Sequence, residues 1–234
     1  MKKAFKKGVI LSVGVLWIGI ASPLSADILY QNTTTLLQNI RQQVLPGQEL
    51  GNEITLAETG NMKYFSFEYW GTNTLSPGNS SFQGNGNGPV SVDVKFYRNN
   101  GAPFNGYPTP NTLIYDTGFF AINPTPQSTL VYTLGDGLPL GGVQFNFQDI
   151  TWSVQFENTG PNDSVGVDFY FPPTVGTSYG DTWENDGTGW VLDVQSPPAS
   201  FGALMETPEP SSMMLSLLGG LGILIAVRRF RRKE

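Results

Sequence analysis

Residues 150–157 read ITWSVQFE, and this short stretch decides the fold class of the chain. Its apolar side chains recur at every second position, with polar ones between them; they are Ile150, Trp152, Val154 and Phe156. Because successive side chains of a β-strand point to opposite faces, this period predicts a strand with one face in a core and the other facing solvent. The sequence Asn158-Thr159-Gly160-Pro161 then ends the strand in a turn.

The same alternation recurs along the middle of the chain. Residues 90–97 read VSVDVKFY, and further runs lie at 165–171, 65–69, 129–134, 143–147 and 190–194. Turn-forming glycine, proline and asparagine separate these runs. The pattern predicts about nine or ten antiparallel strands between residues 27 and 206, which we interpret as a single all-β domain, a β-sandwich of jelly-roll type.

Three segments do not follow this alternation. Residues 36–44 place Leu36, Ile40 and Val44 at helical spacing, so either a short helix or an irregular strand is expected there. Residues 73–89 and 101–110 are rich in glycine and asparagine, and each is predicted to form a long loop.

The composition limits both the compartment and the chemistry. The chain has no cysteine and no histidine. Disulfides, the commonest zinc ligands and the commonest general base are therefore missing. Residues 27–206 hold four basic and seventeen acidic side chains, a formal charge of −13. Such a surface repels phosphate backbones, so nucleic acid is not an expected partner.

The first 26 residues differ from the middle of the chain. Residues 2–7 contain four lysines, an apolar run follows over residues 8–21, and small residues stand before Asp27. These are the three parts of a secretory signal peptide, whose apolar run is expected to form a helix. We expect cleavage after Ala26. An uncleaved anchor is the alternative, although the apolar run is shorter than the roughly 20 residues that a spanning helix needs.

The last segment, residues 207–234, reads TPEPSSMMLSLLGGLGILIAVRRFRRKE. We interpret residues 211–227 as a transmembrane helix in the inner membrane. A basic tail over 228–233 would stop transfer and stay in the cytoplasm; its cations are Arg228, Arg229, Arg231, Arg232 and Lys233. Pro208 and Pro210 hold Glu209 in a stiff, non-helical segment just outside the bilayer. A plain linker before an ordinary anchor is the alternative.

The order of Pro208-Glu209-Pro210, apolar helix and arginine cluster resembles the PEP-CTERM sorting signal of Gram-negative bacteria. The resemblance covers residues 207–234 alone, and Thr207 stands where this family usually has valine. It implies a partner, the membrane-embedded exosortase, which recognises the tail and removes it. It also implies export across the inner membrane, a transient anchor, and release to the cell surface or the extracellular polysaccharide matrix.

One loop in the middle carries the richest set of candidate ligand groups. In residues 180–189, GDTWENDGTG, the carboxylates of Asp181, Glu184 and Asp186 are weak candidates for calcium, which takes six to eight oxygen ligands. A hairpin turn with a positive φ at Gly187 is the favoured alternative. We expect no cofactor, and calcium at this loop is the alternative.

Aromatic residues near loops suggest a second kind of site, because an exposed ring can stack on a sugar. Trp183 is the candidate platform, and the other aromatic residues near loops are Trp70, Tyr107 and Tyr179.

The function of residues 27–206 is left with three candidates. We expect a protein that is not an enzyme and has a structural or adhesive role. The alternative is a carbohydrate-binding module, which secreted β-sandwiches of this pattern resemble, with extracellular polysaccharide as the partner. A glycan-active hydrolase is the third; the local carboxylate pairs for it are Asp163 with Asp168 and Glu184 with Asp186.

Overall fold

The computed structural model describes residues 26–73, 84–86, 88–122, 127–133 and 138–207, with the backbone alone for 38–42 and 127–133. The predicted signal peptide helix and the predicted transmembrane helix lie outside these ranges. Over the part that is described, no helix has the length and apolar character needed to cross a bilayer. Residues 26–207 belong to one compact unit.

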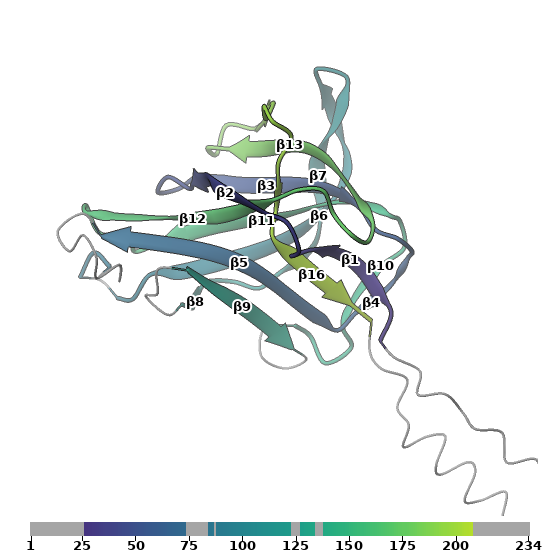
Figure 1. Ribbon diagram of the computed structural model, residues 1–234, viewed down its shortest axis with the longest axis horizontal. Helices are drawn as coiled ribbons and strands as arrows, with labels where there is room; N and C mark the ends of the chain where they lie inside the picture. Colours follow the sequence, from purple (N-terminus) through teal and green to yellow (C-terminus); the bar gives the residue numbers. More distant parts are fainter. Residues whose placement is uncertain (1–25, 74–83, 87, 123–126, 134–137, 208–234) are drawn as a thin grey trace, which may run out of the picture. The chain divides into compact units, whose positions relative to one another are not determined.

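The described strands form two large antiparallel sheets that pack as a sandwich, and this confirms the predicted all-β class (Figure 1). The first sheet has the order β1 (Ile28–Asn32), β16 (Ala203–Glu206), β5 (Tyr64–Asn73), β12 (Asp163–Tyr170) and β15 (Ser200–Phe201), with β2 (Leu36–Gln43) beside β12 and β9 (Gln127–Thr133) beside β5. The second has the order β14 (Trp190–Asp193), β13 (Thr177–Asn185), β3 (Glu49–Thr55), β11 (Asp149–Glu157), β6 (Ser91–Phe104) and β7 (Tyr107–Asp116), with β8 (Phe120–Ala121) beside β6. A small third sheet pairs β10 (Val143–Phe145) with β4 (Gly60–Met62). A strict jelly-roll order stays a prediction.

The alternating runs of the sequence form strands as predicted. The run at 150–157 lies in β11, and its neighbour in the second sheet, β6, contains the run at 90–97 except for Val90. Residues 36–43 form strand β2 and not a helix, and the register of β2 against β12 shifts between Asp168 and Tyr170. The irregular strand is therefore the correct alternative for this segment.

The loop predicted for residues 101–110 is wrong, because these residues form the end of the β6–β7 hairpin. Phe104 pairs with Tyr107 across a two-residue turn, and the turn residues Asn105 and Gly106 have φ of 51° and 90°. Two positive φ values in succession are what a tight hairpin turn requires, and Asn-Gly is the strongest short sequence signal for it. The loop predicted for residues 73–89 falls mostly outside the described residues.

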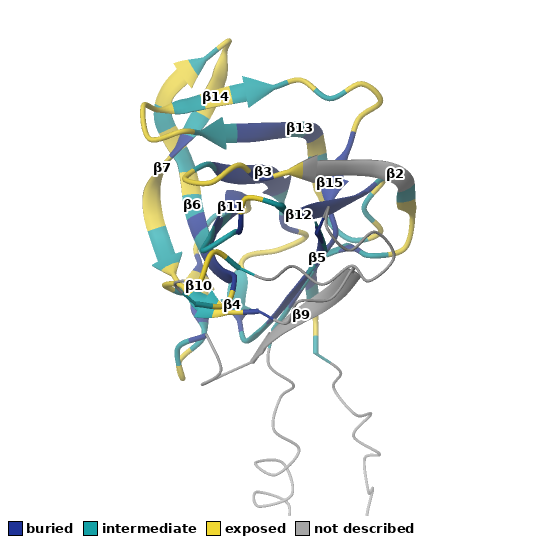
Figure 2. Cartoon of the chain, turned by 90° about the vertical axis from the view of Figure 1, so that its left-hand side faces the viewer, coloured by how far each residue is buried: buried dark blue, intermediate teal, exposed yellow. Residues whose placement is uncertain are grey.

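The core lies between the two large sheets and is centred on Trp152 of β11. Its ring contacts three rings of the first sheet, with centroid distances of 5.3 Å to Phe65, 5.7 Å to Phe67 and 5.3 Å to Phe201. All four side chains are fully buried, and Figure 2 shows β11 and β5 as buried elements. Edge-to-face and tilted contacts of this kind add to the stabilisation from the buried area itself.

A buried polar chain also links the sheets. The hydroxyl of Tyr30 on β1 lies 3.1 Å from Oγ of Ser200, which donates to Oδ1 of Asn52 on β3 at 2.6 Å. Burial raises the pKa of Tyr30 above its ordinary value, so the phenol keeps its proton and can act as a donor. Because each buried hydroxyl has a partner, this chain joins β1, β15 and β3 without leaving a hydroxyl unsatisfied.

The second sheet is strongly curled, like half of a barrel. β14 and β6 are four positions apart in its strand order, which would be about 19 Å in a flat sheet. Yet the ring of Trp190 on β14 lies 5.6 Å from that of Tyr97 on β6, and Phe104 of β6 lies 6.5 Å from Trp183 of β13. The curl therefore brings β13 and β14 close to β6 over the face that points away from the core.

This curl leaves no room for a side chain at position 51 on β3. A Cβ atom on Gly51 would lie 2.8 Å from Cγ2 of Thr151 and 3.3 Å from Cζ3 of Trp190. We predict that Gly51→Ala lowers the free energy of unfolding by about 1–3 kcal/mol, because rings and strands must move apart. Gly141→Ala is the control, since nothing lies within 4 Å of its Cβ position. Urea denaturation of both variants measures the difference, and an equal loss in the two would contradict the crowding argument.

Candidate functional site

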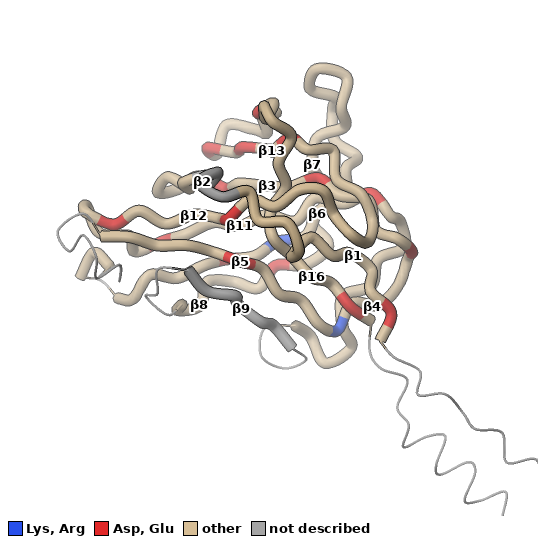
Figure 3. The backbone as a smooth tube through the Cα atoms, in the orientation of Figure 1, with Lys and Arg blue, Asp and Glu red and all other residues tan. Residues whose placement is uncertain are grey.

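Acidic residues are spread over the described domain, and basic residues are few (Figure 3). A group of polar side chains, acidic ones among them, lies on the outer face of the second sheet. We call this surface the polar face and define it by Glu49, Glu53, Asp93, Lys95, Tyr97, Thr151, Ser153 and Gln155. Strand register places Thr151 between Glu53 and Tyr97, and Ser153 beside Lys95. The same period of two that puts valine and phenylalanine in the core thus gathers these polar groups on the opposite side.

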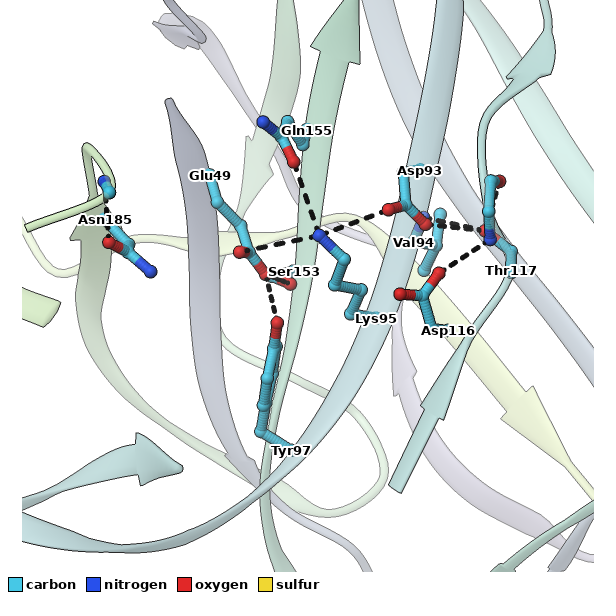
Figure 4. Close-up of polar contacts among 12 residues, drawn as sticks. Glu49, Asp93, Val94, Lys95, Tyr97, Asp116, Thr117, Ser153, Gln155 and Asn185 are labelled. Carbon is cyan, nitrogen blue, oxygen red and sulfur yellow. Dashed lines mark hydrogen bonds and ion pairs between the residues drawn. The ribbon is translucent and has the colours of Figure 1, made fainter. Parts of the chain in front are cut away.

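Lys95 is the centre of the polar face (Figure 4). Its Nζ atom lies 3.1 Å from Oδ2 of Asp93 and 3.7 Å from Oε2 of Glu49. It also donates to Oε1 of Gln155 at 3.3 Å. The ammonium group therefore joins β3, β11 and β6 through one side chain.

The two carboxylates have further donors. Oε1 of Glu49 accepts from the hydroxyl of Tyr97 at 2.9 Å and from Oγ of Ser153 at 2.5 Å. Oδ1 of Asp93 accepts from Oγ1 of Thr117 at 3.1 Å. The groups of this network thus satisfy one another, which is the arrangement that buried charges need.

Burial and charge act against each other in this network. Burial raises the pKa of Asp93 more than the ammonium of Lys95 lowers it. Burial alone would lower the pKa of Lys95, but the carboxylates of Glu49 and Asp93 raise it, and the net direction is upward. Burial, followed by the charge of Glu49, raises the pKa of Tyr97. Lys95 therefore stays charged and Tyr97 stays a hydrogen-bond donor at neutral pH.

We predict that Lys95→Met lowers the free energy of unfolding by about 3 kcal/mol, because it leaves two buried carboxylates without their cation. Lys63→Met is the matched control, since it also keeps the aliphatic stem, and it should change stability by less than about 1 kcal/mol. Urea denaturation at neutral pH measures both. Adding Glu49→Gln and Asp93→Asn to Lys95→Met should restore most of the loss; a triple variant weaker than the single one would refute this account.

The structure corrects the prediction for Trp183. Its side chain is fully buried, with 0% of its surface exposed, so it is not the exposed platform that its position near a loop suggested. Its ring packs on Phe104, and its Nε1 atom donates to Oε2 of Glu53 at 3.0 Å. The physical reason is the curl of the second sheet, which brings the end of β6 over β13.

Glu53, the acceptor of this bond, is a buried carboxyl group among other acids. Burial raises its pKa, the bond from Trp183 lowers it, and the charges of Asp149 and Asp181 raise it again, with a net upward shift from 4.5. The folded protein therefore binds a proton at Glu53 more tightly than the unfolded chain does.

The pH dependence of stability follows from this direction. The stabilisation from protonated Glu53 is complete below its unfolded pKa and is lost as the pH rises through the folded pKa. We predict that wild type loses stability relative to Glu53→Gln as the pH rises above 4.5, because glutamine keeps an acceptor for Trp183 and carries no charge. Urea denaturation of both proteins between about pH 4 and pH 8 tests this. A stability difference that does not change with pH would contradict it.

Residues 180–189 form the hairpin between β13 and β14, as the favoured alternative predicts. In its turn, Oδ1 of Asp186 accepts from the amide and the hydroxyl of Thr188 at 2.9 and 2.6 Å, and these bonds lower the pKa of Asp186. Oδ1 of Asp181 accepts from the amide of Gln195 at 3.1 Å. The described residues, which include Asp181, Glu184 and Asp186, contain no group of three acidic side chains placed to hold a metal ion.

The other residues singled out from the sequence are dispersed. Trp70 is buried and donates to the carbonyl of Val167 at 3.2 Å, whereas Tyr107 and Tyr179 are exposed by 43% and 47%. Asp163 accepts from the amides of Gly84 and Gly160, both at 2.8 Å, so this carboxylate holds a loop together. Its proposed partner Asp168 is buried.

The two ends of the domain meet at Asp27 and Thr207, a contact that we call the terminal clasp. The amide of Thr207 donates to the carbonyl of Asp27 at 2.9 Å. The amide of Asp27 donates to Oγ1 of Thr207 at 3.0 Å, and this hydroxyl lies 3.3 Å from the carbonyl of Asp27. The clasp continues the pairing of β1 with β16, which lie side by side in Figure 1. Sequence reasoning did not find it, because 180 positions separate the two residues.

The sorting residues Pro208, Glu209 and Pro210, and the basic residues from Arg228 to Lys233, lie outside the described residues. Pro208, the first residue of the Pro-Glu-Pro triplet, directly follows Thr207 of the clasp. Lys63 adds a further bond at this end of the domain, from its amide to the carbonyl of Glu206 at 2.9 Å.

Comparison with known families identifies the tail. Residues 206–232 match the PEP-CTERM protein-sorting motif, which confirms the resemblance found in the sequence. The match begins at Glu206, the last residue of β16. No characterised protein matches the chain in a sequence comparison. The motif implies an exported protein that is processed by exosortase and sorted to the cell surface.

Proposed function

We propose that this exported, exosortase-processed protein has a structural or adhesive role at the cell surface or in its matrix, and that it is not an enzyme. The observation that carries the proposal is the β6–β7 hairpin, whose outer strand β7 pairs with β6 on one side and with no other described strand. β7 stands at the end of the second sheet, and its side chains Tyr107 and Leu113 are exposed by 43% and 48%. Apolar side chains along the edge of a sheet favour contact with another surface.

The polar face supports the same proposal by contrast. Lys95, Glu49 and Asp93 pair with one another, and Trp183 is enclosed by Phe104 and Glu53. Groups that could otherwise take part in catalysis or ligand binding are thus used to hold the curled sheet together. Exposed apolar side chains, those of Tyr107 and Leu113, are found instead on the β6–β7 hairpin. The negative charge of the domain keeps it soluble.

A carbohydrate-binding function is the second candidate, and one observation favours it. The ring of Tyr179 on β13 is exposed by 47%, and the nearby charge of Asp149 adds to burial in raising its pKa. Beside it, Oγ1 of Thr55 donates to Oδ1 of Asp149 at 2.8 Å. An exposed ring next to a hydroxyl and a carboxylate is the chemistry that a saccharide site needs.

Two variants with matched side chains separate these candidates. Tyr107→Ala and Tyr179→Ala remove rings of similar exposure from β7 and β13, and each is expressed in the producing bacterium. We predict that Tyr107→Ala lowers the fraction retained on cells and matrix about five- to thirtyfold, the effect of losing 1–2 kcal/mol, and that Tyr179→Ala retains wild-type behaviour. Quantitative immunoblotting of cell, matrix and medium fractions is the measurement.

Binding to purified exopolysaccharide is measured for the same variants. If Tyr179→Ala alone loses this binding, the carbohydrate-binding function is correct and the adhesive hairpin is not. Wild-type retention in both variants contradicts the adhesive proposal as well.

A further inference from the structure

The sorting motif begins inside the folded domain. β16 lies between β1 and β5 in the first sheet, so its residues pair on both sides. Glu206, where the motif match begins, pairs with Ile28 of β1 and with Tyr64 of β5. A partner that binds its substrate as an extended chain cannot reach residues that are already in the middle of a sheet. If exosortase binds its substrate in this extended form, recognition starts after this strand.

Thr207 lies between Glu206, the last residue of β16, and Pro208, the first residue of the Pro-Glu-Pro triplet. Its amide and its hydroxyl both bond to the backbone of Asp27, at 2.9 and 3.0 Å. Pro208 follows at once, and proline fixes its own φ and restricts the residue before it. Glu209 is two residues beyond Thr207, which is at most about 7 Å of chain. The clasp thus fixes where the motif leaves the domain and limits how far its glutamate can move.

We propose that Thr207 is a positioning residue for exosortase processing: through its bonds to Asp27 it holds the sorting motif at one end of the folded domain. The inference rests on the match to the sorting motif and goes beyond it by naming a residue and its partner. Ordering a segment before it binds removes part of the entropic cost of recognition.

Asp27 gives the clasp a second role. The predicted signal peptide ends at Ala26, so its removal makes the nitrogen of Asp27 the amino terminus. That nitrogen is the donor to Oγ1 of Thr207 at 3.0 Å, and as an ammonium group it makes a stronger, charge-assisted bond. Removal of the leader therefore tightens the contact that positions the tail.

The test follows tail removal by pulse-chase in the producing bacterium with the full-length chain. Thr207→Val keeps the shape of the side chain and loses its hydroxyl bonds, and we expect the half-time of tail removal to lengthen about fivefold, as for one net hydrogen bond. Thr207→Ser keeps the hydroxyl and should restore the wild-type half-time. Thr188→Val, which removes a hydroxyl bond to Asp186, controls for a general loss of stability and should process normally.

A disulfide variant tests the direction of the effect. Gln31 and Leu204 are partners in the β1–β16 ladder, and directly opposed residues of antiparallel strands are close enough for a disulfide. Gln31→Cys with Leu204→Cys should lock the pair and still lose its tail at the wild-type rate. Accumulation of the oxidised, tail-bearing form would show that the strands must open, and would overturn the proposal.

Glu209→Ala separates failure of the proposal from failure of the sorting assignment. If this variant keeps its tail while Thr207→Val matures at the wild-type rate, the sorting motif works and the clasp does not position it. If Glu209→Ala also loses its tail at the wild-type rate, the assignment of these residues as the signal that exosortase recognises is wrong. The proposal also requires that the mature protein retain both Asp27 and Thr207, and the intact mass of the mature protein checks this.

Discussion

The contact between Trp152 and the rings of the opposite sheet is the constraint on which the rest of the structure depends. The chain has no cysteine, so no disulfide joins the two large sheets, and packing must hold them together with the help of the buried hydrogen bonds of Tyr30, Ser200 and Asn52. Trp152 contacts Phe65, Phe67 and Phe201 across the sandwich. Once these rings fix which face of β11 is inside, the period of two fixes every other side chain of the strand.

The outer face of the second sheet is the other half of this constraint. Inward valines and phenylalanines leave Glu49, Asp93 and Lys95 on the far side, where the two carboxylates are buried and the lysine is half-buried. A single lysine compensates two carboxylates, while Glu53 nearby has Trp183 as a neutral donor. The domain thus tolerates buried acids by pairing or by a raised pKa, and its stability depends on pH for that reason.

The sequence predicts local features of this molecule well and long-range ones poorly. Alternating runs such as 150–157 became strands because one side of each is buried, and the sorting motif is legible because its parts are contiguous. A loop was predicted where the β6–β7 hairpin lies, although Asn105-Gly106 is a strong sequence signal for a hairpin turn. The burial of Trp183 and the terminal clasp had no local signal: the first depends on the curl of a whole sheet, and the second joins residues 180 positions apart.

The adjacency of β1 and β16 has a consequence for maturation. A chain whose first and last strands pair can be shortened at both ends without losing a rung of its ladders. If trimming falls before Asp27 and after Thr207, the β1–β16 ladder and the backbone bond between Asp27 and Thr207 both remain in place. Both cuts then fall outside the β1–β16 pairing, so the described domain keeps the contacts of its own that stabilise it.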